Sequence, residues 1–422
     1  MVVIVRGGEV VHRKGYGLAD LAAGKPVTRE TRFLLGSLTK PFTALTVMQL
    51  AERGQLGLED PIRRFLPEFS PYGDSLTIRH LLGHTGGLPE YEGMFVTRGQ
   101  VDSRWPRSVR TPRSTYEPTA KDATALLARE ARPAFPPGSK YQYSNSGYVL
   151  LAQIVERVSG LRFADYLQRN VFEPAGMTAS LLYDERRPDV PERSLSYSRA
   201  DTGYAEIDYT PFDAIYGEDN IYATADDVAR WFQALRAGRL INQASLLTSW
   251  TRGVTTAGDT VDYGLGWSIG SLLGRKQIGH GGSWRGFRSQ LFHLPGDDLT
   301  VILLANFAEF LGSWVAAEIA WVYLGDRLPA PVEITLPRDR IEGLVGRYRV
   351  RRYTLELQAA GAQLSLGSAV LPRAAVALSS DSTGFIRRNP GVGLRFERDG
   401  RGRATALTLI LPGGRLRIPR VE

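Results

Sequence analysis

The chain contains no cysteine, and this absence removes several kinds of protein at once. A disulfide scaffold and a thiol nucleophile are both excluded, although the absence does not fix the cellular compartment. With no cysteine and only five histidines, the sequence shows no recognisable set of metal ligands. We therefore expect neither a metal nor any other cofactor.

The sequence also lacks an apolar run of membrane-spanning length, and no signal peptide precedes Val2. As written, the chain would be cytoplasmic, and it would be periplasmic or secreted if its true N-terminus is missing. Its 422 residues are 43% apolar and 23% charged. This composition and length predict a globular protein with large cores and two domains.

The charge of the chain is unbalanced, with a formal net charge of +8. The basic residues are nearly all arginine and are dispersed, with no basic run and no interleaved aromatic platform. This pattern argues against nucleic acid as a partner. A weak attraction to anionic surfaces such as cell-wall polymers fits it better.

Three short blocks of the sequence carry chemistry: Gly36–Lys40, Tyr143–Asn145 and Gly279–Ser283. Ser37 and Lys40 are three residues apart, so a helix places the hydroxyl and the amine on one face. An uncharged lysine there can take the proton of the serine, which an arginine cannot do. Tyr143 can relay that proton to a leaving group. The three blocks together predict an acyl-transfer enzyme.

The residues around Ser37 predict its place in the fold. After Ser37, apolar residues recur at helical spacing up to a glycine at position 54. Pro41 is tolerated only where a helix has just begun. Ser37 is therefore expected in or just before the first turn, where free backbone N–H groups suit an oxyanion.

With these motifs the chain resembles the serine β-lactamase and penicillin-binding protein superfamily. It is similar to the branch that holds class C β-lactamases, D-alanyl-D-alanine carboxypeptidases, D-aminopeptidases and β-lactamase-like esterases. The resemblance runs from the N-terminus to about residue 325. It includes the three blocks and four supporting stretches: Ile78–Pro89, Phe135–Gly138, Tyr263–Trp267 and Leu294–Asp297.

The resemblance implies an α/β (α+β) β-lactamase-like fold, with an antiparallel sheet flanked by helices and a helical subdomain. It implies that Ser37, Lys40 and Tyr143 are catalytic. It also implies four substrate-binding residues: Asn145, His280, Gly282 and Ser283. Many β-lactamases have a lysine where this chain has His280, so a cation that helps to hold a substrate carboxylate is missing.

Other histidines are expected to be structural. His84 begins a block, His84–Gly86, that looks like the third family motif but precedes the tyrosine and ends in a glycine turn. We interpret it as a turn or core histidine. His12 and His293 lie in strand patterns and are read in the same way.

The pattern along the chain predicts a sheet built from both ends of a hydrolase domain. Residues 1–20 read as a hairpin around Gly7 and Gly8, residues 33–250 as mostly helical, and residues 261–307 as strands. Gly312–Leu324 reads as a closing helix. Residues 94–121 form either a loop that selects substrate or a plain surface loop.

The domain boundaries follow from proline and from a change of period. We expect a hydrolase domain at 1–328, a linker at 329–338 and an all-β small barrel at 339–422. The barrel resembles the lipocalin-like domain of some family D-aminopeptidases. A packed barrel that supports the cleft or an oligomer is favoured over one that houses a ligand.

The function that the sequence favours is a serine hydrolase that acts through an acyl-enzyme. The expected substrate is a small-molecule or short-peptide ester or amide, cleaved by a D-stereospecific peptidase or esterase. A β-lactamase or penicillin-binding protein is the alternative. A non-catalytic ligand-binding relative is disfavoured by the intact serine, lysine and tyrosine. A homo-oligomer stays open.

Overall fold

The fold is described from a computed structural model, whose described residues are 1–69, 71–101, 116–130, 132–328, 332–350, 353–368, 373–411 and 414–421. The predicted loop at 94–121 and the predicted linker at 329–338 fall partly outside them. The chain divides into two compact units, each taken by itself below. The first comprises Met1–Ile269, Ile278–Leu291 and Ile302–Glu309, and the second comprises Gly270–Gln277, Phe292–Val301 and Phe310–Glu422.

A six-stranded sheet combines strands from early and late in the chain, as the sequence predicts. Its order is β12-β13-β14-β15-β1-β2. The expected hairpin is present, since β1 and β2 pair antiparallel and both Gly7 and Gly8 between them have positive φ. The strands are β1 (Val2–Arg6), β2 (Glu9–Lys14), β12 (Ser268–Leu272), β13 (Arg275–Trp284), β14 (Phe287–Leu294) and β15 (Leu299–Ala305).

Residues 33–250 are mainly helical, as expected. The helices are η1 (Gly36–Thr39), α1 (Lys40–Glu52), η2 (Ile62–Arg64), η3 (Pro71–Asp74), α2 (Ile78–Leu82), α3 (Tyr91–Thr97), α4 (Ala120–Glu130), α5 (Asn145–Ser159), α6 (Phe163–Leu167), η4 (Gln168–Phe172), α7 (Glu173–Ala175), α8 (Ala225–Arg236) and α9 (Gln243–Ser249). Short strands lie before, between and after these helices: β3 (Leu18–Asp20), β4 (Lys25–Pro26), β5 (Phe33–Leu34), β6 (Leu181–Leu182), β7 (Tyr197–Arg199), β8 (Tyr204–Glu206), β9 (Ile221–Ala223), β10 (Gly253–Val254) and β11 (Thr260–Val261).

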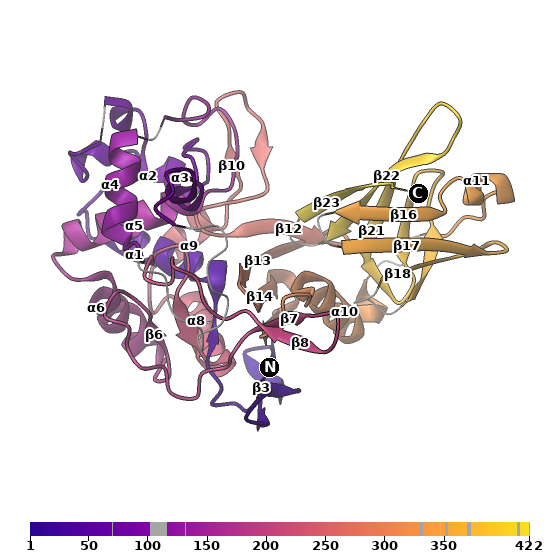
Figure 1. The fold of residues 1–422 in the computed structure, drawn as a ribbon, viewed down its shortest axis with the longest axis horizontal. Helices are drawn as coiled ribbons and strands as arrows, with labels where there is room; N and C mark the ends of the chain where they lie inside the picture. The colour runs from indigo at the N-terminus through magenta and orange to yellow at the C-terminus, as the bar shows by residue number, and fades with distance from the viewer. Residues whose placement is uncertain are drawn as a thin grey trace. The chain divides into compact units, whose positions relative to one another are not determined.

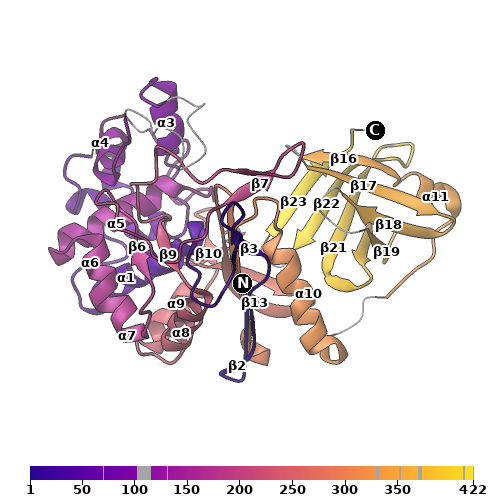
Figure 2. The same cartoon turned by 60° about the horizontal axis from the view of Figure 1, so that its bottom comes forward.

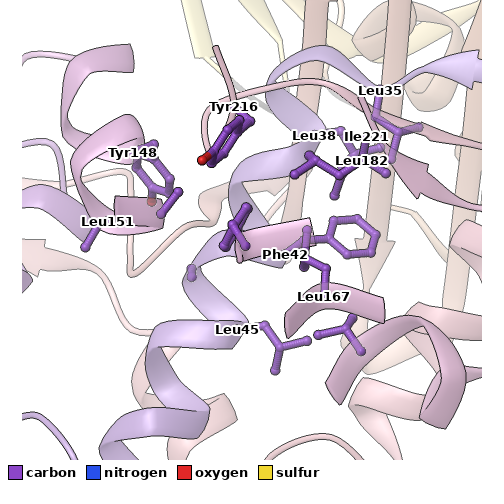
Figure 3. Packing of buried hydrophobic residues seen from close by; sticks show 14 of the residues in the cluster. Leu35, Leu38, Phe42, Leu45, Tyr148, Leu151, Leu167, Leu182, Tyr216 and Ile221 are labelled. Carbon is purple, nitrogen blue, oxygen red and sulfur yellow. The ribbon is translucent and has the colours of Figure 1, made fainter. Parts of the chain in front are cut away.

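Helix α1 lies at the centre of the first unit. Its residues from Lys40 to Leu50 are all buried, which a helix with apolar residues on every side requires. Helices α1, α5 and α6 pack against one another, as Figures 1 and 2 both show. In Figure 3 the side chains of Leu38, Phe42 and Leu45 point into this core. The first turn of α1 is therefore packed against this hydrophobic core.

A small sheet links the start of this helix to a distant segment. Strand β9 lies between β5 and β6, and the N–H of Leu35 donates to the carbonyl of Ile221 at 2.8 Å. The residues just before β9 are thereby brought beside the residues just before α1. Glu218 and Lys40, which are far apart in the sequence, become neighbours in this way.

The second unit contains an antiparallel sheet of eight strands in sequential order. A bridge between Tyr348 and Arg420 joins the first strand to the end of the last, so the barrel is nearly closed. The strands are β16 (Gly346–Val350), β17 (Tyr353–Ala360), β18 (Gln363–Gly367), β19 (Ala374–Leu378), β20 (Thr383–Ile386), β21 (Asn389–Arg398), β22 (Ala404–Leu411) and β23 (Gly414–Pro419), drawn orange to yellow in Figure 1.

Four helices of the described residues belong to this unit: η5 (Pro295–Asp297), α10 (Gly312–Leu324), η6 (Gly325–Arg327) and α11 (Arg338–Glu342). The bounds of α10 match the expected closing helix. Its Trp314 is part of the same hydrophobic cluster as the barrel residues Leu357, Leu366 and Leu394. Side chains that fill a cluster of this kind fit a packed barrel.

The barrel strand β19 is not among those that the sequence predicts, which are Gly346–Val350, Tyr353–Gln358, Gln363–Leu366, Gly384–Arg388, Leu394–Arg398, Ala406–Leu411 and Arg415–Ile418. Its sequence, Ala374 to Leu378, contains three alanines, which are depleted in strands and favour helices. The strand is held instead by its pairing with β18 and β20. Among the described helices, none has the length and apolar character needed to cross a membrane.

Candidate active site

Ser37 lies in the short turn η1, which runs directly into α1, as the position of Pro41 predicts. The residue before it, Gly36, has φ +54°, a left-handed conformation that favours glycine. A Cβ atom at Gly36 would stand 2.9 Å from the backbone nitrogen of Ser283. The close approach of these two segments is therefore possible only with glycine at position 36.

Lys40 is the first residue of α1, and its side chain is completely buried. Its Nζ donates to Ser37 Oγ at 3.0 Å and to Asn145 Oδ1 at 2.9 Å. The same atom donates to the backbone carbonyl of Glu218 at 3.1 Å and lies 3.3 Å from its carboxylate. Four acceptors around one nitrogen suit an ammonium group, which has three hydrogens to donate.

The surroundings of Lys40 favour its charged form, and they bear on a choice that the sequence leaves open, namely whether Lys40, Tyr143 or both act as the base. Burial by itself disfavours the ammonium form, but Tyr143 and the carboxylates of Glu218 and Asp219 outweigh it and raise the pKa of Lys40. The sequence did not reveal the carboxylates that accompany the lysine.

Tyr143 and Asn145 stand at the start of α5. The side chain of Ser144 caps this helix, and the N–H of Asn145 donates to both oxygens of Glu90 at 3.0 and 3.2 Å. The ring of Tyr143 is partly exposed at 38%, and its centroid lies 4.9 Å from Lys40 Nζ. The structure thus brings Ser37, Lys40, Tyr143 and Asn145 together.

Strand β13 carries the remaining predicted residues. A Cβ atom at Gly282 would stand 1.9 Å from the carbonyl oxygen of Leu35, so glycine is needed for this strand to pass so close. Ser283 is exposed and lies beside Gly36. The sequence assigns Gly282 and Ser283 to substrate binding, and the structure brings both close to Ser37.

His280 is buried on the same strand, and both of its ring nitrogens have partners. Nδ1 lies 2.7 Å from the carbonyl of Gly281, and Nε2 lies 2.8 Å from the hydroxyl of Tyr263. A carbonyl only accepts, so we assign the proton to Nδ1, and the tyrosine donates to Nε2. Burial and the charge of Lys40 lower the pKa of His280 to about 3. A direct contact with substrate would require one of these bonds to break.

Several residues at the site were missed from the sequence. One carboxylate oxygen of Glu218 accepts a hydrogen bond from Lys40 Nζ, and the other accepts a hydrogen bond from the hydroxyl of Tyr91 at 2.7 Å. Tyr263 stands in a stretch quoted above for the resemblance, where it received no role. For Glu218, the only signal was a pair of acids, Glu218 and Asp219, directly after a glycine.

Several acidic side chains lie around the site. Burial raises the pKa of Glu90, of Asp213 and of Asp219, and it raises the pKa of Glu92 to about 7. The guanidinium of Arg285 counteracts this shift at both Glu92 and Asp213. The positive charge of Arg285, which follows the third block, therefore interacts with nearby acidic side chains.

The site contains a serine hydrogen-bonded to a buried lysine, a tyrosine whose ring faces that lysine, and a neighbouring strand. This arrangement is typical of active-site serine hydrolases with a Ser-x-x-Lys motif. The sequence model of the beta-lactamase family matches residues 1–321. The chain belongs to this family, and the expected fold and enzyme class are confirmed.

Three relatives illustrate the similarity. Penicillin-binding protein 4* of Bacillus subtilis is 33% identical over 326 residues, covering 73% of this chain and 68% of that protein. A D-aminopeptidase of Cereibacter sphaeroides is 29% identical over 334 residues, covering 77% of this chain. The octameric penicillin-binding protein homologue from Pyrococcus abyssi has a solved structure with a TM-score of 0.67 and 25% identity, covering 99% of this chain and 94% of that one.

The matched region covers different shares of the relatives' own lengths. The match spans only 60% of the length of the Cereibacter sphaeroides D-aminopeptidase. The solved Pyrococcus abyssi homologue, in contrast, is matched over almost its whole length.

Proposed function

We propose that this protein hydrolyses amide or ester bonds through an acyl-enzyme on Ser37, as a D-stereospecific peptidase or esterase. The substrate class is a small molecule or short peptide, and the chemistry needs no cofactor. The observation that carries the proposal is the position of Lys40 Nζ, 3.0 Å from Ser37 Oγ and 4.9 Å from the centre of the Tyr143 ring. The name of the D-aminopeptidase relative supports the substrate class.

The first step is acylation. Lys40 is held as an ammonium, so we assign Tyr143 as the base that takes the proton of Ser37. The serine oxygen then attacks the carbonyl carbon, and the N–H groups of Ser37 and Ser283 receive the oxyanion. Tyr143 next passes its proton to the leaving nitrogen or oxygen, and the bond to that atom breaks.

The second step releases the acyl group. Tyr143, which has given its proton to the leaving group, takes a proton from water, and the resulting hydroxide attacks the ester carbonyl. The tetrahedral intermediate collapses, the acid leaves, and the proton returns to Ser37. Throughout, Lys40 stabilises the negative charge that moves between Ser37 and Tyr143, and Asn145 holds Lys40 in place.

The charges of the site support substrates that lack a carboxylate beside the scissile bond. His280 is neutral, with both nitrogens paired. Arg285 is offset by the nearby carboxylates of Glu92 and Asp213. A free substrate carboxylate would meet these acids without a dedicated cation, whereas a neutral or amino-terminal substrate would not be penalised.

The alternative function, a β-lactamase or penicillin-binding protein, is favoured by the relative named penicillin-binding protein 4*. The two functions are separated by kcat/KM for a p-nitrophenyl ester and a D-aminoacyl amide against nitrocefin, in native protein and in His280→Lys. We expect a strong preference for the ester and the amide. A missing charge-assisted contact to the nitrocefin carboxylate lowers kcat/KM for nitrocefin by roughly 10- to 150-fold. The preference for the ester and the amide over nitrocefin should therefore be smaller in His280→Lys.

Thermal unfolding of His280→Lys is the control, because the new ammonium would be buried near Lys40. Efficient nitrocefin hydrolysis by the native protein, above about 10⁵ M⁻¹s⁻¹, would instead identify a β-lactamase.

An oligomer is also proposed. The supporting observation is the likeness to an octameric homologue over 99% of the chain. Light scattering coupled to size exclusion tests it, and a monomer at micromolar concentration would refute it.

A further inference from the structure

His84 occupies an unusual position directly after α2. Its backbone has φ +58°, which is uncommon outside glycine and asparagine, and its side chain is only 1% exposed. The imidazole lies among aromatic rings, with centroids 4.2 Å from Tyr143, 4.6 Å from Tyr263 and 5.1 Å from Tyr148. A left-handed turn thus directs this residue towards the tyrosine of the site.

His84 also accepts hydrogen bonds from the main chain on both sides of Tyr143. Its backbone carbonyl accepts from the N–H of Gln142 at 2.9 Å. Its Nδ1 accepts from the N–H of Ser144 at 3.1 Å. One residue therefore holds the N–H groups that directly flank Tyr143.

The hydrogen bond from Ser144 defines the state of the imidazole. A nitrogen that accepts from a backbone N–H carries no proton, so the ring is neutral with its hydrogen on Nε2. Burial, together with the charge of Lys40, lowers the pKa of His84 well below its usual value. Nε2 has no hydrogen-bond partner among the described residues. The ring thus keeps one hydrogen bond, and that bond leads to the Tyr143 segment.

We propose that His84 is a positioning residue for Tyr143: its carbonyl and Nδ1 hold the flanking N–H groups, and its ring supports the phenol beside Lys40. The inference rests on the proposed role of Tyr143 as the carrier of the proton. It replaces the interpretation of His84 as a plain turn or core histidine with a role in proton transfer to the leaving group.

This role has a kinetic signature. A p-nitrophenolate leaving group departs without being protonated, whereas the amine of an amide must receive a proton as the bond breaks. Tyr143 also takes the proton of Ser37 with both substrates, so a displaced Tyr143 should slow both, and the amide more because it loses the protonation of its leaving group as well. Loss of core packing alone would lower both rates by the same factor.

The test compares two amide side chains at position 84. In His84→Asn the side-chain oxygen replaces Nδ1 as acceptor, and asparagine tolerates a left-handed backbone. In His84→Gln the acceptor is displaced towards the Nε2 position. We expect His84→Gln to lower kcat for a D-aminoacyl amide by about 10- to 100-fold, and to lower kcat for the p-nitrophenyl ester by a factor at least about threefold smaller. His84→Asn should keep both rates within about threefold of native.

Controls separate this inference from the proposed function. If Ser37→Ala or Tyr143→Phe keeps full amide activity, the proposed function fails and takes the inference with it. If those variants are inactive but His84→Gln cleaves the amide at the native rate, or slows both substrates equally, His84 has no positioning role. If His84→Gln does not fold, His84→Phe, which keeps a ring but offers no acceptor, replaces it with the same expectations.

Discussion

Removing the charge of Lys40 should destabilise the fold as well as abolish activity. Lys40 Nζ lies 3.3 Å from Glu218 Oε2, with exposures of 0% and 2%. At an effective dielectric constant of about 20, this attraction is about 5 kcal/mol, before the cost of desolvation is subtracted. Lys40→Met would leave the carboxylate of Glu218 buried with the hydroxyl of Tyr91 as its remaining side-chain partner.

Breaking a buried pair on one side costs about 3–5 kcal/mol of unfolding free energy. Lys40→Met should lose this amount, together with at least about 10³-fold in kcat. The double variant Lys40→Met/Glu218→Gln removes both charges, so it should regain most of the stability and none of the activity. Lys140→Met, at an exposed lysine just ahead of Tyr143, is the matched control and should change neither quantity.

The assay combines calorimetric unfolding with turnover of a p-nitrophenyl ester. Because the pKa of Lys40 in the fold is raised above 10.5, its contribution is fully present below that value and is lost only as the pH rises through the raised pKa. The stability gap between native protein and Lys40→Met should therefore be constant between about pH 6 and pH 9. Equal stability of the single and double variants would refute a charged lysine in the resting enzyme.

Three further outcomes are expected. Ser37→Ala should lose about 10³-fold or more in kcat, and an organophosphonate should label the native protein only on the peptide carrying Ser37; a second label would contradict a single nucleophile. We propose that the chain divides into a hydrolase domain at 1–328, a linker at 329–338 and a barrel at 339–422. Truncation near Pro331, outside the described residues, should leave Ser37 reactive towards the organophosphonate, although stability falls because Trp314 loses its barrel partners. A folded truncated protein that resists labelling would argue against this division. His280 has a pKa of about 3, so the pH–rate profile of His280→Asn should keep its ascending limb above pH 5 at the native position, and a displaced limb would mean that His280 titrates.

Much of the fold could be predicted because it depends on local chemistry. The hairpin at the N-terminus follows from two glycines between apolar runs, and the start of α1 follows from Pro41. The barrel strands follow from a period of two, with β19 as the exception because alanine carries little strand preference. The Ser37–Lys40 contact was predictable for the same reason, since three residues of helix fix the distance.

By itself, the sequence determined which residues could do chemistry and the elements that carry them, because spacing and local propensity act over a few residues. The tertiary structure decided the charge of Lys40, the pairing of His280 and the part of His84. Each of these depends on groups distant in the sequence: Glu218 beside Lys40, Tyr263 beside His280, and Ser144 beside His84. A pKa or a hydrogen bond of this kind is set by burial and by neighbours, and only the folded chain brings those neighbours together.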